Sequence, residues 1–348
     1  MNELNIETST FTKVNDYYLE VVGDISNAKI TKGFELGTYN LFEILFTQLH
    51  YRNLSKEFIT KEELNEVFST KEILERINNK YVVKLTPEQY KEIIYLDPSK
   101  AEKTKCTKVV KGNKKLDNGE LVPRVEYIDK AIWESTGTLF AKNELDKIRL
   151  IPYMSRLNGT FYFVFEEYAA NELLKCDSGY NIQYVLDKLK LKTIYSKNLY
   201  SYICRNYPII LSGYHYNKFN KEFNGAKYRG EDIETLKEKL GLTNYKLSGD
   251  IIRQLTGAVN TLNEVLNLGL KIHIEKNGIE GKTSTIEKIK FTLEPNEERD
   301  KKYLGELKRK PNKTNKTNYS TTRNKSYKEH GVGRRSANST GNISNQCF

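Results

Sequence analysis

A helical pattern near the C-terminal end of the sequence presents side chains that could hydrogen-bond to nucleic-acid bases. Residues 249–267 place apolar side chains at helical spacing, after Ser248, a residue type that caps helices. The opposite face and its flanks carry a cation, two amides, a hydroxyl and a glycine: Arg253, Gln254, Thr256, Gly257 and Asn260. Guanidinium and amide groups form paired hydrogen bonds to guanine and adenine, respectively. The pattern indicates a base-reading surface, and the alternative is a set of merely solvated side chains.

Gly257 and Glu264 indicate which part of this helix would contact DNA. Gly257 stands inside the helix, where glycine costs about 1 kcal/mol relative to alanine. A close approach to DNA would explain it, and a tolerated surface glycine is an equally weighted alternative. Glu264, near the other end, would repel phosphate. We therefore expect the N-terminal half of the helix to dock.

Phosphate ligands are expected on both sides of the helix. Lys246 precedes it, and two strands are expected after it, at residues 270–275 and 285–293. The turn between these strands carries ammonium and hydroxyl groups that suit phosphate, on Lys276, Lys282, Thr283 and Ser284. An ordinary solvated turn is the alternative interpretation.

The elements that would position these groups recur in the same order. In the first half of the sequence, helices are expected at residues 39–51, 60–77 (as two short helices), 86–96 and 127–134, before strands at 148–155 and 160–165 around Asn158-Gly159. In the second half, helices are expected at 182–206 and 233–240 before the helix at 249–267 and its hairpin. Helices followed by a hairpin are typical of a winged helix. The pattern predicts an α+β fold with two tandem winged-helix domains, mostly helical, with short β-hairpin wings.

Length and composition divide the chain further. The chain has 348 residues, which is more than a single hydrophobic core normally organises. We expect an N-terminal extension (1–35), a first winged-helix domain (36–175) with insertions at 55–80 and 99–124, a second winged-helix domain as the main DNA reader (181–296), and a disordered basic tail (303–348). The net charge of +11 gathers toward the C-terminus, where residues 301–348 hold 12 Lys and Arg against two acids. The tail is interpreted as a basic arm that adds phosphate contacts, and a merely solvated tail is the alternative.

Several classes of protein are disfavoured by what the sequence lacks. No run approaches the roughly 20 apolar residues of a membrane span, and the first residues, MNELNIETST, lack a basic segment followed by an apolar run. A cytoplasmic protein without a membrane partner is therefore expected. The four cysteines are isolated, which predicts no metal site. His50, His215, His273 and His330 are far apart, which disfavours a metal-dependent nicking enzyme, and no complete phosphate-binding loop occurs. We expect neither enzymatic activity nor a cofactor.

The residues from 149 to 293 resemble the initiator replication proteins of iteron-containing, theta-replicating plasmids. The matching features are the hairpin at Asn158-Gly159, the helix pair at 233–267 and the final strand at 286–293. Between them lies a segment that is similar to a family pattern through Lys192, Tyr195, Ser196, Leu199 and Tyr200. Thr261-Leu262-Asn263 and Gly281-Lys282 depart from the family's common Glu-Ile-Asn and Gly-Arg.

The resemblance implies a plasmid replication initiator that binds repeated double-stranded DNA sites at an origin through both domains. It also implies homodimers that repress their own promoter, and monomers that open the origin and recruit host helicase or initiator proteins. A winged-helix transcriptional regulator with no role in replication needs the same DNA-reading surface and stays the alternative. Direct repeats and an AT-rich segment beside the gene would distinguish the two.

Overall fold

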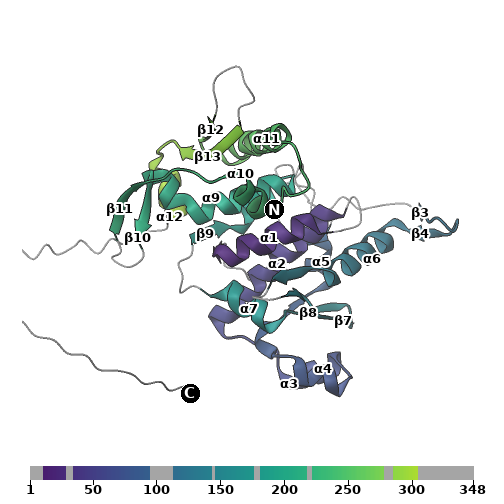
Figure 1. Ribbon diagram of the computed structural model, residues 1–348. Coiled ribbons are helices and arrows are strands. Elements are labelled where there is room, and N and C mark those ends of the chain that lie inside the picture. Colours follow the sequence, from purple (N-terminus) through teal and green to yellow (C-terminus); the bar gives the residue numbers. More distant parts are fainter. Residues whose placement is uncertain are drawn as a thin grey trace, which may run out of the picture. The chain divides into compact units, whose positions relative to one another are not determined.

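Helices and small antiparallel sheets make up the described part of the chain, a mixed α+β structure (Figure 1). The computed structural model describes residues 11–28, 34–94, 113–142, 146–175, 181–217, 222–277 and 285–304. All of them belong to one unit of the chain, which spans residues 1–307. Within the described ranges, no helix is long and apolar enough to span a membrane.

A three-stranded sheet and its helices form the N-terminal half of the described structure. Its elements are α2 (Glu35–Ser55), α3 (Lys61–Val67), α4 (Lys71–Arg76), a 3-10 turn (Asn79–Tyr81), β2 (Val82–Leu85), α5 (Pro87–Ile94), β3 (Asn113–Lys115), β4 (Leu121–Pro123), α6 (Arg124–Gly137), β5 (Phe140–Lys142), β6 (Lys147–Arg149), β7 (Tyr153–Leu157), β8 (Thr160–Val164) and α7 (Glu167–Leu174). The strands of the sheet have the order β2-β8-β7. The central helix α2 is contacted by α5 and α6, so these helices share one core with the sheet.

The predicted hairpin at Asn158-Gly159 connects β7 and β8. The two residues have φ values of 50° and 83°, which a two-residue turn between twisted strands requires. The predicted first strand, 148–155, is wrong at its start. Residues 147–149 belong to β6, which pairs with β5 instead of continuing into the hairpin.

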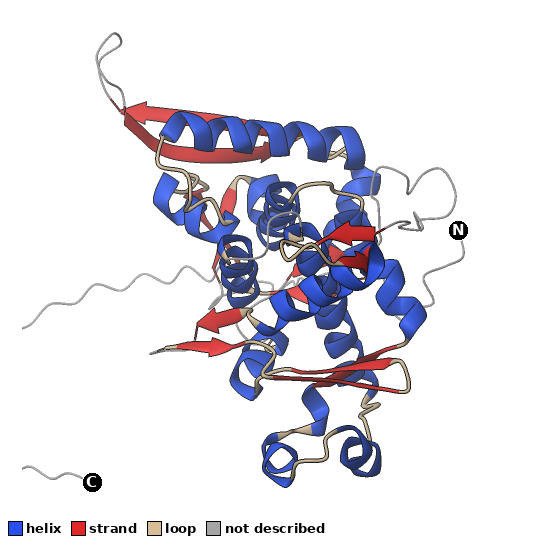
Figure 2. Cartoon of the chain, turned by 90° about the vertical axis from the view of Figure 1, so that its right-hand side faces the viewer, coloured by secondary structure: helices blue, strands red, loops and turns tan. Residues whose placement is uncertain are grey.

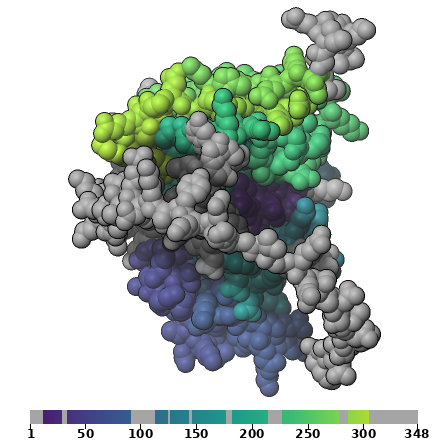
Figure 3. Space-filling model, turned by 60° about the vertical axis from the view of Figure 1, so that its left-hand side comes forward, coloured from purple at the N-terminus to yellow at the C-terminus, as the bar shows by residue number. Residues whose placement is uncertain are grey.

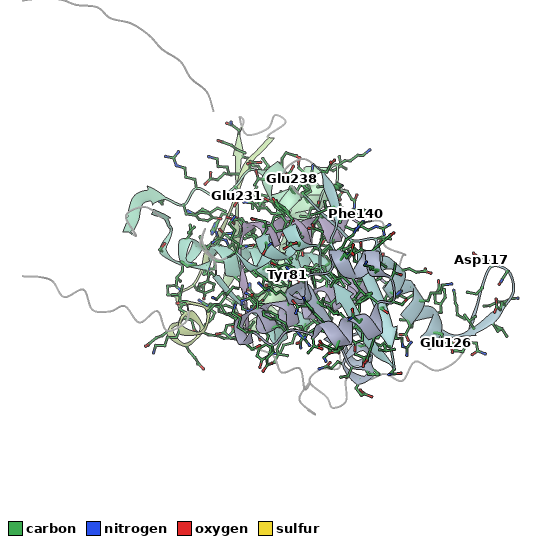
Figure 4. The ribbon with its side chains drawn as sticks, turned by 90° about the horizontal axis from the view of Figure 1, so that it is seen from below. Tyr81, Asp117, Glu126, Phe140, Glu231 and Glu238 are labelled. Atoms are coloured by element: carbon green, nitrogen blue, oxygen red, sulfur yellow. The ribbon has the colours of Figure 1, made fainter. Side chains whose placement is uncertain are left out.

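The two segments expected as insertions form structure of their own. The Thr60 hydroxyl accepts a hydrogen bond from the Glu63 amide at 3.2 Å and so begins α3, as predicted. Helices α3 and α4 belong to a second small core: Ile59, Leu64, Phe68, Val82, Tyr162 and Val164, with partly buried neighbours. Of residues 99–124, the described part contains the β3-β4 hairpin, whose tip residue Asp117 lies away from the body of the structure (Figure 4).

Residues 181–304 form the C-terminal half. Its elements are β9 (Asn181–Tyr184), α8 (Val185–Leu189), α9 (Ile194–Ser212), β10 (Tyr214–Asn217), β11 (Glu222–Lys227), α10 (Ile233–Leu240), α11 (Ser248–Leu266), β12 (Leu270–Asn277), β13 (Thr285–Leu293) and α12 (Glu297–Leu304). The predicted long helix at 182–206 is confirmed for residues 194–206, which lie in α9, and is wrong in its first part. Strand β9 and the short helix α8 precede α9, which begins where the Thr193 hydroxyl accepts a hydrogen bond from the Ser196 amide.

The segment expected as an N-terminal extension is part of the core. Strand β1 (Phe11–Val14) pairs with β9, and helix α1 (Asp16–Asn27) packs against α10 and α9. A methyl group on Gly23 would lie 2.4 Å from the backbone oxygen of Glu238, so α1 and α10 touch through their backbones. Figure 3 shows the dark purple residues of this segment between the green residues of one half and the blue and teal residues of the other. One hydrophobic core therefore continues through both halves, and their division into two domains stays a prediction.

Helix α12 corrects the predicted start of the tail. Tyr303 is only 4% exposed, its ring stacks on that of Tyr207, and its hydroxyl donates a hydrogen bond to the Asp187 carboxylate. Residues 303 and 304 therefore belong to the folded structure. The rest of the predicted tail lies outside the described residues.

Candidate nucleic-acid interface

Helix α11 separates its polar and apolar residues as the sequence pattern predicts. Its inner face buries Ile251, Leu255, Ala258, Val259 and Leu262. The predicted outward residues Ser248, Arg253, Thr256, Gly257 and Asn260 are exposed, and Gln254 is half-buried. The helix lies along the β12-β13 hairpin at the top of Figure 2. Six of the predicted DNA-binding residues thus share one helix that the core holds from behind.

The turn between α10 and α11 fixes where the outward face begins. Asp232 caps α10, because its carboxylate accepts a hydrogen bond from the Thr235 amide at 2.8 Å. Gly241, with φ of 68°, ends α10 in the left-handed conformation that glycine adopts easily. The predicted cap of α11 is wrong by one residue, since Ser248 is the first helical residue and Leu247 is the cap. Lys246, just before the cap, is exposed, and its role as a phosphate ligand stays a prediction.

Arg253 forms an ion pair on its own helix. Its Nη2 lies 3.0 Å from Oδ1 of Asp250, and 74% of its side chain is exposed. An exposed pair of this kind contributes at most about 1 kcal/mol, so a DNA base can replace Asp250 at small cost. The sequence pattern missed Asp250, although its spacing of three residues from Arg253 is the ordinary signal for a helical ion pair.

The β12-β13 hairpin holds one predicted residue in the described structure. The strands pair from Leu270 opposite Leu293 to Asn277 opposite Thr285. Lys276 is exposed near the end of β12 and makes no ion pair with any described residue. The other three predicted phosphate ligands of this hairpin, Lys282, Thr283 and Ser284, lie outside the described residues.

The helix before the other hairpin, α6, has a different surface. Its exposed side chains include Glu126, Lys130 and Glu134, and Lys130 lies 3.9 Å from Glu134. Glu126 stands near the base of the β3-β4 hairpin (Figure 4). Carboxylates repel DNA phosphates, so α6 is less suited than α11 to enter a groove. The clearest candidate interface is therefore α11 with the residues that flank it.

A buried polar network that no local pattern in the sequence indicates connects the two halves. The Lys188 ammonium donates hydrogen bonds to Glu43 Oε1 at 2.7 Å and to the Tyr18 hydroxyl at 2.5 Å. Gln183 donates to the same hydroxyl at 3.1 Å. Burial raises the pKa of Tyr18 and lowers that of Lys188, with the Glu43 carboxylate opposing the second effect. Because these side chains are buried, the network joins elements of the fold and offers no surface to a substrate.

A second buried lysine borders this network. Lys197 donates a hydrogen bond to the backbone oxygen of Lys188 at 2.6 Å, and its side chain has no exposed surface. Burial and the adjacent Lys188 ammonium lower the pKa of Lys197 to about 7. Both lysines lay within a stretch whose apolar spacing predicted one long helix, so no local signal marked them as buried.

The described residues contain no group of three His, Cys, Asp or Glu side chains that could hold a metal ion. No protein-family model and no curated protein matches the chain.

Proposed function

We propose that this protein binds double-stranded DNA sequence-specifically, with α11 as the reading helix and the β12-β13 hairpin as a wing. The observation that carries the proposal is an arrangement that occurs twice. In the N-terminal half, α2, β2, α5, α6 and the β7-β8 hairpin occur in this order, with α3, α4, the 3-10 turn and the β3-β4 and β5-β6 pairs between them. Strand β2 pairs with the last strand, β8. In the C-terminal half, α9, an isolated bridge at Glu231, α10, α11 and the β12-β13 hairpin occur in this order, with the β10-β11 pair between α9 and Glu231. Glu231 pairs with Ile289 of the last strand, β13.

A helix, a short strand, two helices and a hairpin whose last strand pairs with the first strand form a winged helix. In such a domain, the helix before the hairpin lies in the major groove. That helix is α11 in the C-terminal half and α6 in the N-terminal half. The outward residues of α11 favour it as the reader, whereas the exposed carboxylates of α6 limit that half to a supporting role.

The biological role we propose is plasmid replication initiation at an origin with repeated binding sites. It rests on the resemblance of residues 149–293 to plasmid initiators and on the order of elements above. The partners that follow from the proposal are origin DNA, a second copy of the chain and host helicase or initiator proteins. A transcriptional regulator is the alternative, and it would bind its promoter without supporting replication.

A binding titration tests DNA recognition directly. Full-length protein is titrated by fluorescence anisotropy against the DNA upstream of its gene and against a scrambled duplex, at two salt concentrations. We expect binding to the upstream DNA to be at least about 1,000-fold tighter than to the scrambled duplex. Equal affinity for both duplexes would contradict sequence-specific recognition.

A replication assay separates the initiator from the regulator. The gene and its flanking DNA are placed on a molecule that has no other origin, and transformants are counted. We expect transformants with the natural chain and none with Arg253→Ala. Specific DNA binding without any transformants from the natural chain would favour the regulator.

A further inference from the structure

Leu247 has an unusual position at the start of α11. The residue is 68% exposed, more than any other large hydrophobic residue in the described ranges. It is also the N-terminal cap of the helix, and its side chain forms no capping hydrogen bond. The caps of α1, α3, α9 and α10 accept a hydrogen bond from a backbone amide. The caps of α2, α4, α6 and α8 form no such bond either, but none of these four cap residues is an exposed large hydrophobic residue, as Leu247 is.

Both properties are unfavourable for the protein alone. Leucine is among the poorest capping residues, because it offers no acceptor to the free amides of the first turn. An exposed leucine also leaves apolar surface in water. A single exposed leucine is common, but here it coincides with a missing cap at the end of α11 that is expected to dock.

The surroundings of Leu247 indicate what could cover it. Lys246, Ser248 and Gly249 are all exposed, and a methyl group on Gly249 would meet no atom within 4 Å. Leu247 is therefore an exposed apolar side chain between the cation of Lys246 and the hydroxyl of Ser248. A DNA major groove combines the same features in complementary form: phosphates at its edges, polar base edges, and the 5-methyl group of thymine as its apolar contact.

We propose that Leu247 packs against the 5-methyl group of a thymine in the bound DNA and so sets a preference for thymine at that position. The inference rests on the proposed DNA recognition by α11. The first residues of a recognition helix contact base edges, and Leu247 lies immediately before the first turn of α11.

Replacing thymine by uracil provides the test, because uracil lacks only the methyl group. The preferred duplex is first selected from random sequences with full-length protein, and each thymine is then replaced by uracil in turn. For the natural chain, we expect one replacement in each binding site to weaken binding about fourfold, the effect of one buried methyl group. The chain with Leu247→Ala should bind the thymine and uracil duplexes equally.

Two further variants separate this contact from effects on folding. Val265→Ala shortens another exposed apolar residue of α11, at its C-terminal end, and should keep the discrimination between thymine and uracil. Leu247→Asn supplies a capping acceptor, so it should raise the melting temperature while it weakens DNA binding. Loss of discrimination in a chain that is more stable cannot come from unfolding.

The outcomes distinguish this inference from the proposed function. If selection returns no preferred sequence, DNA recognition by α11 is wrong and the role of Leu247 is wrong with it. If a sequence is selected but no thymine replacement weakens binding, or Leu247→Ala keeps the discrimination, the proposed function stands and only the thymine contact is overturned.

Discussion

The ammonium of Lys188 lies 2.7 Å from the carboxylate of Glu43, and neither side chain has more than 1% of its surface exposed. Lys188 belongs to α8 and Glu43 to α2, so the pair connects the C-terminal half to the N-terminal half. Removing both charges from water costs free energy, which their attraction and their bonds to Tyr18 and Gln183 offset. The pair therefore makes each half dependent on the other.

Breaking this pair on one side should destabilise the protein strongly. Lys188→Met leaves the Glu43 carboxylate buried without its cation and should lower the free energy of unfolding by about 3 to 5 kcal/mol. Adding Glu43→Met should recover at least about 1 kcal/mol relative to the sum of the two single effects. Urea unfolding followed by circular dichroism measures each variant. Strictly additive effects would mean that the two charges do not interact.

The stability of the protein should rise between pH 7 and pH 9 because of Lys197. In the folded chain its pKa is about 7, against the usual 10.5. Within this window the unfolded chain binds more protons, so the free energy of unfolding increases with pH, by up to about 1.4 kcal/mol per pH unit. Lys197→Met should remove this contribution while the Lys188 backbone oxygen keeps its bond to the Leu191 amide. An unchanged pH dependence in the variant would assign it to other groups.

Two helical glycines should respond in opposite ways to alanine. At Gly23 the added methyl group meets the Glu238 backbone oxygen, so Gly23→Ala should destabilise the fold by about 1 to 3 kcal/mol. At Gly257 nothing lies within 4 Å, so Gly257→Ala should stabilise it by about 1 kcal/mol. Thermal unfolding of the two variants checks both signs, and a stabilising Gly23→Ala would contradict the close contact of α1 with α10.

The same Gly257→Ala chain tests whether DNA requires the glycine. Nothing in the described protein occupies the space beside it, which leaves two explanations: a close approach of DNA and a tolerated surface glycine. We expect weaker specific binding from a more stable protein, measured by anisotropy on the selected duplex. Unchanged affinity would make Gly257 a tolerated surface residue.

Arg253→Ala should weaken specific binding by about 1 to 3 kcal/mol and leave the melting temperature nearly unchanged. Lys71→Ala on α4 is the matched control, because Lys71 is also an exposed helical cation paired with a carboxylate of its own helix. The control should bind like the natural chain. Equal losses on the selected and the scrambled duplex would contradict base readout by Arg253.

Deleting residues 305–348 should reduce the salt dependence of binding and keep the sequence preference. The removed residues carry 10 Lys and Arg against one Glu at position 306 and one at 329. Cutting after Leu304 keeps the buried Tyr303, which a cut at 303 would remove. A salt slope equal to that of the full chain would mean that these residues do not contact phosphate.

Local sequence signals located most of α10, α11 and the hairpin after them. Asp232 and Gly241 mark the two ends of α10, and the alternation in residues 285–293 indicates a strand. Each of these signals concerns residues that are close in sequence, so the sequence alone is enough to interpret it. The pairing of β1 with β9 is different, because Phe11 and Tyr184 are far apart in sequence. Residues 181–184 fit a helical pattern as well as a strand, and only the distant partner decides between them.

The sequence predicts which residues form the outward face of α11, but not which residue caps the helix. The outward residues of α11 follow from helical spacing, whereas the cap fell on Leu247 because the chain enters the helix one residue earlier than Ser248 suggests. The buried Lys188 and Lys197 could not be found from sequence. Long cationic side chains are usually exposed, and only the approach of α2 and α1 encloses them.

The position of α1 has a consequence for how the chain is made. Its contact surface on α10 and the partner strand of β1 are synthesised only after about half to two thirds of the chain, so β1 and α1 leave the ribosome long before these partners. Until then their apolar side chains remain uncovered, a state in which nascent chains aggregate or bind chaperones. Either half expressed as a separate fragment should likewise aggregate or bind chaperones. Refolding the two fragments together should restore the folded structure.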